Sequence, residues 1–123
     1  MLTVEDAAEH YALTPGTIRA RIRAGDLRAQ RINRHYRLDW EDVWSCEQGP
    51  APKGRRAERY RMPLMTKSRV AAKLRVSVRT VERMIERGLP TRNIWGTVRI
   101  NPADARDWLV SHHGLDLRDD WHV

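Results

Sequence analysis

LTPGTIRARIRAGDL at residues 13–27 and VSVRTVERMIERGLP at residues 76–90 are two versions of one pattern, 63 positions apart in a chain of 123 residues. They agree at most of their apolar positions, at their hydroxyl-bearing residues and at one glycine near the C-terminal end of each stretch. Self-similarity of this kind indicates that one small structural unit occurs twice. A chain of this length is sufficient for two very small compact units.

Each copy predicts two short helices joined by a tight turn. Thr3 precedes the apolar and acidic run VEDAAEHY, so its hydroxyl can accept a free backbone N–H at the start of the first helix. Thr14 is placed to cap the second helix, and Gly25 to end it. Ser77 and Gly88 occupy the corresponding positions in the second copy.

The second helix of each copy has one apolar face and one polar face. Ile18 and Ile22 are four residues apart, as are Val81 and Ile85, so each pair should pack on the first helix. The opposite face is small, hydroxylic and cationic, and it contains Gly16, Thr17, Ala20 and Arg23 in one copy and Arg79, Thr80, Arg83 and Glu86 in the other. Such a pair of helices has the form of a helix-turn-helix.

Beyond each glycine the apolar residues alternate around a turn signal, which is Asn33-Arg34 in the first copy and Trp95-Gly96 in the second. Alternation around a turn indicates a β-hairpin. Asp39 and Asn101 then look like caps of a third short helix. The predicted fold is mainly α with small β-hairpin wings, in the order helix, helix, hairpin, helix in each copy.

The two quoted stretches and their downstream segments, NRHYRLDWEDVW and WGTVRINPADARDWL, resemble the MerR superfamily and the related phage excisionases. The resemblance covers residues 2–47 and 65–111. It implies two tandem winged helix-turn-helix domains. In such domains the second helix enters the major groove and the hairpin, or wing, rests on the backbone or minor groove.

The organisation we predict is domain 1 at residues 1–47, a basic linker at 48–63, domain 2 at 64–111 and a tail at 112–123. The linker has two glycines, three prolines and five cations against one acid. It is either a solvated tether or a segment that orders along the phosphate backbone. In the second case its phosphate contacts are Lys53, Arg55, Arg56 and Arg59.

Composition favours a polyanionic partner, because 23 Lys and Arg against 16 Asp and Glu give a net charge of +7. A basic surface that serves only solubility is the alternative. No apolar run is long enough for a membrane span, and the acidic N-terminus is unlike a secretory signal. We therefore expect a cytoplasmic, nucleoid-associated protein with no membrane partner.

Arginine can bond two acceptors on guanine or two phosphate oxygens, and hydroxyls at a helix start can hold a phosphate. On the helices we expect DNA contacts at Thr14, Gly16, Thr17, Arg19, Arg23, Ser77, Arg79, Thr80 and Arg83. On the wings we expect them at Arg31, Asn33, Arg34, His35, Arg37, Arg92, Asn93 and Arg99.

The function we predict is sequence-specific binding of double-stranded DNA, as a bacterial, phage or mobile-element transcription regulator or as a recombination directionality factor, an excisionase. We leave open three protein partners: an integrase, RNA polymerase and a second copy of the chain on DNA. The alternative is a protein-interaction adaptor in which only the second domain binds DNA.

An enzyme is not expected, because the sequence has no Gly-rich phosphate loop and no nucleophile motif. No cofactor is expected either. Cys46 is the single cysteine, and His112, His113 and His122 have no carboxylate or thiol at ligand spacing, so no metal site is predicted.

Overall fold

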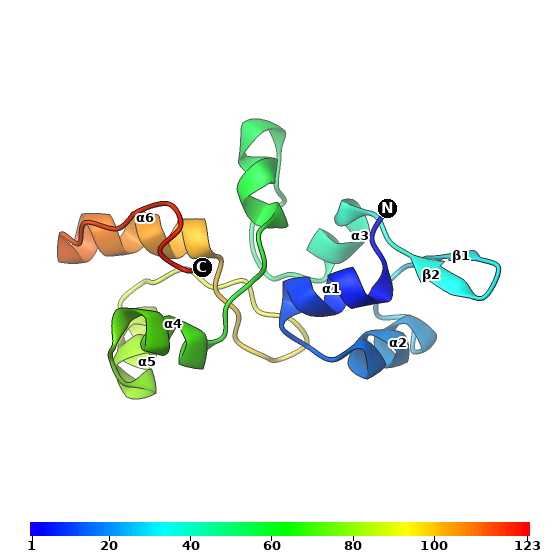
Figure 1. Ribbon diagram of the computed structural model, residues 1–123, viewed down its shortest axis with the longest axis horizontal. Coiled ribbons are helices and arrows are strands. Elements are labelled where there is room, and N and C mark those ends of the chain that lie inside the picture. The colour runs from blue at the N-terminus through cyan, green and yellow to red at the C-terminus, as the bar shows by residue number, and fades with distance from the viewer. The chain divides into compact units, whose positions relative to one another are not determined.

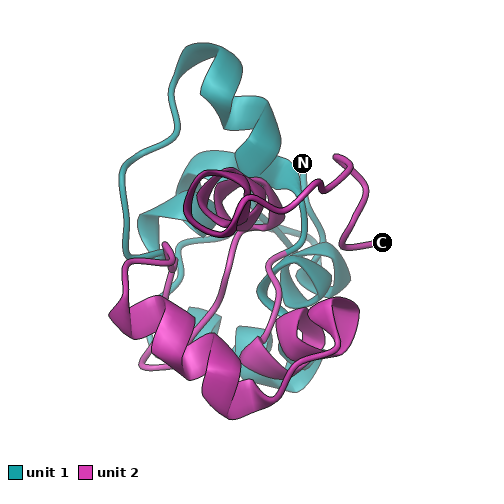
Figure 2. Cartoon of the chain, turned by 90° about the vertical axis from the view of Figure 1, so that its left-hand side faces the viewer, with its two compact units in different colours: residues 1–63 teal, residues 64–123 magenta.

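The computed structural model describes residues 1–123, and the chain divides into two compact units, residues 1–63 and 64–123 (Figure 2). The second unit begins at Leu64, where the sequence predicts the start of a second domain. The predicted linker counts with unit 1 and the predicted tail with unit 2.

Unit 1 follows the predicted order of helix, helix, hairpin and helix (Figure 1). Its elements are α1 (Val4–Tyr11), α2 (Pro15–Arg23), β1 (Gln30–Ile32), β2 (His35–Arg37), α3 (Trp40–Ser45) and the 3-10 helix η1 (Gly54–Arg61). β1 and β2 are antiparallel, with Gln30 opposite Arg37. Asn33 at the turn between them has a φ of 56°.

Hydroxyl caps set the starts of both helices of the helix-turn-helix. The Thr3 hydroxyl accepts from the Asp6 N–H at 3.0 Å, and the Asp6 carboxylate accepts from the Thr3 N–H at 3.0 Å. The Thr14 hydroxyl accepts from the Thr17 N–H at 3.2 Å. Between the helices Ala12 is left-handed, with a φ of 55°. The turn between α1 and α2 is therefore defined by local backbone and cap geometry.

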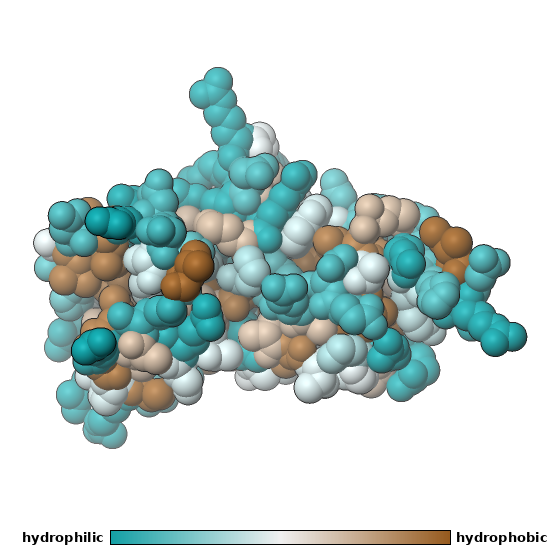
Figure 3. All heavy atoms as spheres, in the orientation of Figure 1, coloured by the Kyte–Doolittle hydropathy of each residue, from teal (hydrophilic) through white to brown (hydrophobic).

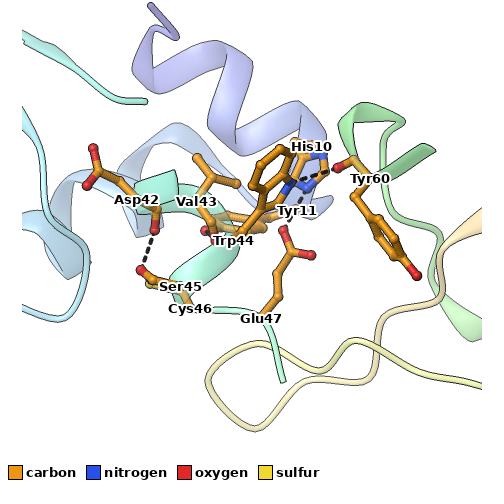
Figure 4. A network of polar contacts seen from close by, with 9 residues as sticks. All are labelled: His10, Tyr11, Asp42, Val43, Trp44, Ser45, Cys46, Glu47 and Tyr60. Carbon is orange, nitrogen blue, oxygen red and sulfur yellow. Dashed lines mark hydrogen bonds and ion pairs between the residues drawn. The ribbon is translucent and has the colours of Figure 1, made fainter. Parts of the chain in front are cut away.

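The core of unit 1 is built from all three α-helices and from the residues that flank the hairpin, Leu27 and Leu38. Its buried apolar residues are Val4, Ala7, Ala8, Tyr11, Ile18, Leu27, Leu38 and Val43. The Tyr11 hydroxyl donates to the Val43 carbonyl at 2.6 Å, and the His10 Nε2 lies 2.9 Å from the Glu47 carboxylate (Figure 4). Burial raises the pKa of Tyr11 above its ordinary value. These bonds attach α3 to α1.

The segment predicted as a linker is not an extended tether over residues 54–61. It forms η1, in which Tyr60 is 8% exposed. The indole N–H of Trp44 in α3 donates to the Tyr60 carbonyl at 3.0 Å. Composition left two alternatives, a solvated tether and a segment that orders along DNA phosphates. The structure instead shows a short helix that is packed on its own unit through Tyr60.

Unit 2 contains α4 (Lys67–Leu74), α5 (Val78–Glu86) and α6 (Pro102–His113). Its caps repeat those of unit 1: the Thr66 hydroxyl accepts from the Arg69 N–H and the Ser77 hydroxyl from the Thr80 N–H, both at 3.1 Å. Arg75 is left-handed, with a φ of 56°. The first two helices of both units thus share one local geometry.

The second predicted hairpin is a tight turn without regular strands. The Arg92 N–H donates to the Arg99 carbonyl at 2.8 Å, and Ile94 and Thr97 form an isolated bridge. Trp95 and Gly96 have positive φ values of 47° and 82°, as the turn signal predicts. The side-chain oxygen of Asn93 accepts from the Arg99 N–H at 3.3 Å. This side-chain hydrogen bond stands in place of a backbone hydrogen bond between two strands.

The predicted tail packs on unit 2. α6 continues to His113, two residues past the predicted end of the domain, and Gly114 ends it with a φ of 61°. Leu117 and Trp121 then pack against the core of unit 2. The Trp121 indole N–H donates to the Pro102 carbonyl at 3.1 Å. Trp121 therefore packs on its own unit.

Cys46 provides a chemical test of this fold. It is half-buried, its thiol donates to the Asp26 carbonyl at 3.4 Å, and burial raises the pKa of the thiol. Since the thiolate is the nucleophile, we expect iodoacetamide to alkylate native Cys46 more slowly than the urea-unfolded chain at about pH 8. The two rates should converge as the pH rises through the native pKa. A constant ratio at all pH values would instead mean that steric access alone slows the reaction.

Candidate nucleic-acid interface

The outward face of α2 carries most of the residues predicted for unit 1. Ile18 is fully buried, whereas Gly16, Arg19 and Arg23 are exposed. A Cβ at Gly16 would meet only the Thr14 hydroxyl, at 4.0 Å, so this part of the face is open. The Thr14 and Thr17 hydroxyls bond each other at 2.9 Å. α2 therefore presents an open surface at Gly16 and two exposed arginines, Arg19 and Arg23.

α5 also has two arginines on its exposed side, together with the exposed acids Glu82 and Glu86. Arg79 and Arg83 are exposed, while Val81 between them is fully buried. Neither guanidinium is held in an ion pair. Thr80 is half-buried and its hydroxyl bonds the Ser77 hydroxyl at 3.0 Å, as Thr17 does with Thr14. Two unengaged guanidinium groups on one helix face suit recognition of base edges or phosphates.

An ion pair joins the first two helices of each unit, with opposite polarity. In unit 1, Arg19 of α2 lies 3.1 Å from Glu5 of α1. In unit 2 the acid is on the second helix, where Glu82 lies 3.0 Å from Lys67 of α4. Arg19, a predicted DNA contact, is thus engaged by a carboxylate. The sequence interpretation missed this pair because it considered Glu5 only as an acid at a helix start.

The wing of unit 1 is cationic and exposed. Hydrophilic side chains extend from it at the right of Figure 3. Its exposed members are Arg31, Asn33, Arg34 and His35. Arg37 is half-buried and donates to the Tyr36 carbonyl at 2.7 Å, and the Arg31 guanidinium lies 5.8 Å from the Tyr36 ring centroid. The hairpin therefore brings the five residues predicted for this wing onto one short ribbon.

The predicted contacts Arg92 and Arg99 in unit 2 are buried inside the unit rather than exposed on its surface. Arg92 is 2% exposed and Arg99 is 9% exposed. The Arg99 guanidinium donates to the Val98 carbonyl at 2.8 Å, and burial lowers its pKa. Asn93 is half-buried, with its side-chain oxygen bonded to Arg99. The number of cations beside a turn signal does not reveal whether their side chains face the solvent or the core.

The four cations predicted in the basic segment lie on η1 and the residue before it. Lys53, Arg55 and Arg56 are exposed, and Arg59 is half-buried. The structure therefore brings these charges together on and beside one short 3-10 helix rather than distributing them along an extended strand.

Comparison with known proteins identifies one part of the chain. Residues 1–43 match the family model described as a helix-turn-helix domain. No curated protein and no solved structure matches the chain. No helix is long and apolar enough to cross a membrane. The matched residues contain α1, α2, both strands and the first turns of α3. Residues 1–43 are accordingly similar to helix-turn-helix domains, a class of module that suggests DNA binding and is typically without enzymatic activity.

Proposed function

We propose that the chain is a sequence-specific DNA-binding protein with two tandem winged helix-turn-helix domains, in which α2 and α5 are the recognition helices. One observation carries this proposal. The caps and the left-handed turn of α4 and α5 repeat those of α1 and α2, the part of the chain that matches the helix-turn-helix family. The exposed cations on α5 and on the wing of unit 1 supply the charge that DNA binding requires.

Two heads in one chain make the second contact with DNA intramolecular. Two individually weak heads can then give useful affinity without a partner chain. This arrangement suits a bacterial, phage or mobile-element regulator, or a recombination directionality factor that shapes DNA for an integrase. RNA polymerase is the corresponding partner of a transcription regulator.

A second candidate is an adaptor in which only unit 2 binds DNA. Unit 1 favours it in one respect: α2 has Gly16 and Ala20 where α5 has Arg79 and Arg83, and its Arg19 is paired with Glu5. A gel shift with Arg19→Ala/Arg23→Ala separates the two candidates. Loss of affinity supports two DNA-binding heads, and unchanged affinity supports the adaptor.

The test of the proposed function is selection of bound fragments from genomic DNA, followed by footprinting and titration at several salt concentrations. We expect a common sequence in the selected fragments. The logarithm of the binding constant should fall linearly with the logarithm of salt, with a slope of about −0.9 for each phosphate neutralised. Absence of retained DNA at about 50 mM salt would contradict the proposal, because electrostatic binding is strongest at low salt.

The position of the footprints then separates the two biological roles. Protected sites over promoters indicate transcription control. Sites beside a recombination locus, together with a change in integrase product ratio when the chain is added, indicate directionality control.

A further inference from the structure

Unit 1 has a surface depression of about 180 Å³ between the start of α1, the middle of α2 and the wing. Glu5 and Arg19 line it from the helices, and Arg34, His35, Tyr36 and Arg37 line it from the hairpin. Three arginines and one carboxylate give it a net charge of +2 with the histidine neutral. It is the place where the cations of the recognition helix and of the wing meet.

The three arginines of the depression differ in what already engages them. Arg19 is 3.1 Å from the Glu5 carboxylate. Arg37 gives one N–H to the Tyr36 carbonyl and is half-buried. Arg34 is exposed and makes no polar contact. The depression therefore retains unused donors at Arg34 and Arg37, while one N–H group of Arg19 is bonded to Glu5.

We propose that a phosphate of the DNA backbone binds in this depression, and that Glu5 is an internal competitor which holds Arg19 until the phosphate displaces it. The proposal rests on the proposed DNA-binding function. A guanidinium fork accepts carboxylate and phosphate oxygens in the same geometry, so the exchange requires no new arrangement of Arg19.

Exposure of the Glu5–Arg19 pair makes the exchange easy. The side chains of Arg19 and Glu5 are 45% and 65% exposed. Ion pairs at such exposure contribute little to stability, because water screens them and holding two long side chains costs entropy. A phosphate that also contacts Arg34 and Arg37 offers Arg19 a site with two further cations. Glu5 thus lowers affinity for DNA without preventing binding.

Unit 2 does not provide an equivalent site. Its inter-helix pair places the carboxylate, Glu82, on α5 and the cation, Lys67, on α4. Gly96 stands where the wing of unit 1 has Arg34, and Arg99 is 9% exposed. Binding of a DNA phosphate at this depression is therefore a property of unit 1. It complements the recognition of bases by α5.

The decisive variant is Glu5→Gln in the full chain, with Glu9→Gln as its matched control. Glu9 is an exposed acid of the same helix that does not line the depression. With a short duplex of random sequence at low salt, Glu5→Gln should raise affinity by about two- to five-fold. Glu9→Gln should raise it less. In an Arg19→Gln background the gain from Glu5→Gln should vanish.

A second variant tests the same site without touching the helix start. Arg34→Gln should lower affinity for every duplex about equally and reduce the salt slope by about one. Arg28→Gln, an exposed arginine of unit 1 outside the depression, is its control and should have a smaller effect. Thermal unfolding of each variant checks that the fold is retained.

The outcomes separate this inference from the proposed function. The role of Glu5 as a competitor would be overturned by equal effects of Glu5→Gln and Glu9→Gln on affinity. It would also be overturned if the gain in affinity from Glu5→Gln persisted in the Arg19→Gln background. Equal effects of Arg34→Gln and Arg28→Gln would overturn the phosphate site. If both of these results are obtained but the wild-type chain still selects a DNA sequence, the proposed function remains intact. A wild-type chain that binds no duplex would remove both.

Discussion

Replacing Arg79 and Arg83 by alanine is expected to weaken binding to the selected DNA site by about 30-fold or more, because each well-formed arginine contact to a base is worth about 1–3 kcal/mol. Both side chains are exposed on α5 and neither is in an ion pair, so the free protein has no competing interaction to lose. Fluorescence anisotropy with the selected site and with a random duplex, at one salt concentration, measures the change.

The comparison of the two duplexes shows what these arginines do. If they read bases, the selected site loses more affinity than the random duplex. If they contact only phosphates, both lose equally. Arg87→Ala/Arg118→Ala is the control, since it removes the same charge from exposed positions of unit 2 outside α5. Equal effects of the two double variants would contradict recognition through α5.

Replacing Ile18 by alanine is expected to destabilise unit 1 by about 2–5 kcal/mol. Ile18 is the fully buried residue of α2 that faces the core, and a truncated side chain leaves a cavity there. Native domains have only about 0.05–0.15 kcal/mol of stability per residue, so a unit of 63 residues would lose much of its total. Urea unfolding followed by circular dichroism and tryptophan fluorescence measures the loss.

Ile32→Ala is the matched control for that variant. It makes the same chemical change in the same unit, but Ile32 is 52% exposed on β1. Exposed substitutions usually change stability by less than about 0.5 kcal/mol. Similar unfolding midpoints for the two variants would mean that α2 is not held to unit 1 through its apolar face.

The helices and their ends were predictable from the sequence because their causes are local. Thr3, Thr14 and Ser77 cap the predicted starts, since a hydroxyl reaches an N–H only three residues away. Ile18 and Val81 are fully buried because their spacing places them on the inner face. At the Trp95-Gly96 turn, Gly96 favours its positive φ of 82°, whereas a positive φ is unusual for a bulky residue such as Trp95.

What only the tertiary structure decided involves residues far apart in the sequence. Arg19 and Glu5 meet across the turn between α1 and α2, and Trp44 orders Tyr60 at a separation of 16 residues. Composition predicted for residues 48–63 either a solvated tether or a segment that orders on DNA, because composition cannot anticipate that bond.

The wings show the same division between local and tertiary causes. Their turns are local, but the direction in which each arginine points depends on the surrounding packing, so Arg34 is exposed and Arg99 is 9% exposed. By itself the sequence determined the helices, their caps and the repeat, because backbone hydrogen bonds and side-chain periodicity act over a few residues. The tertiary structure decided which cations remain available to a partner, because burial and ion pairing depend on contacts between separate elements.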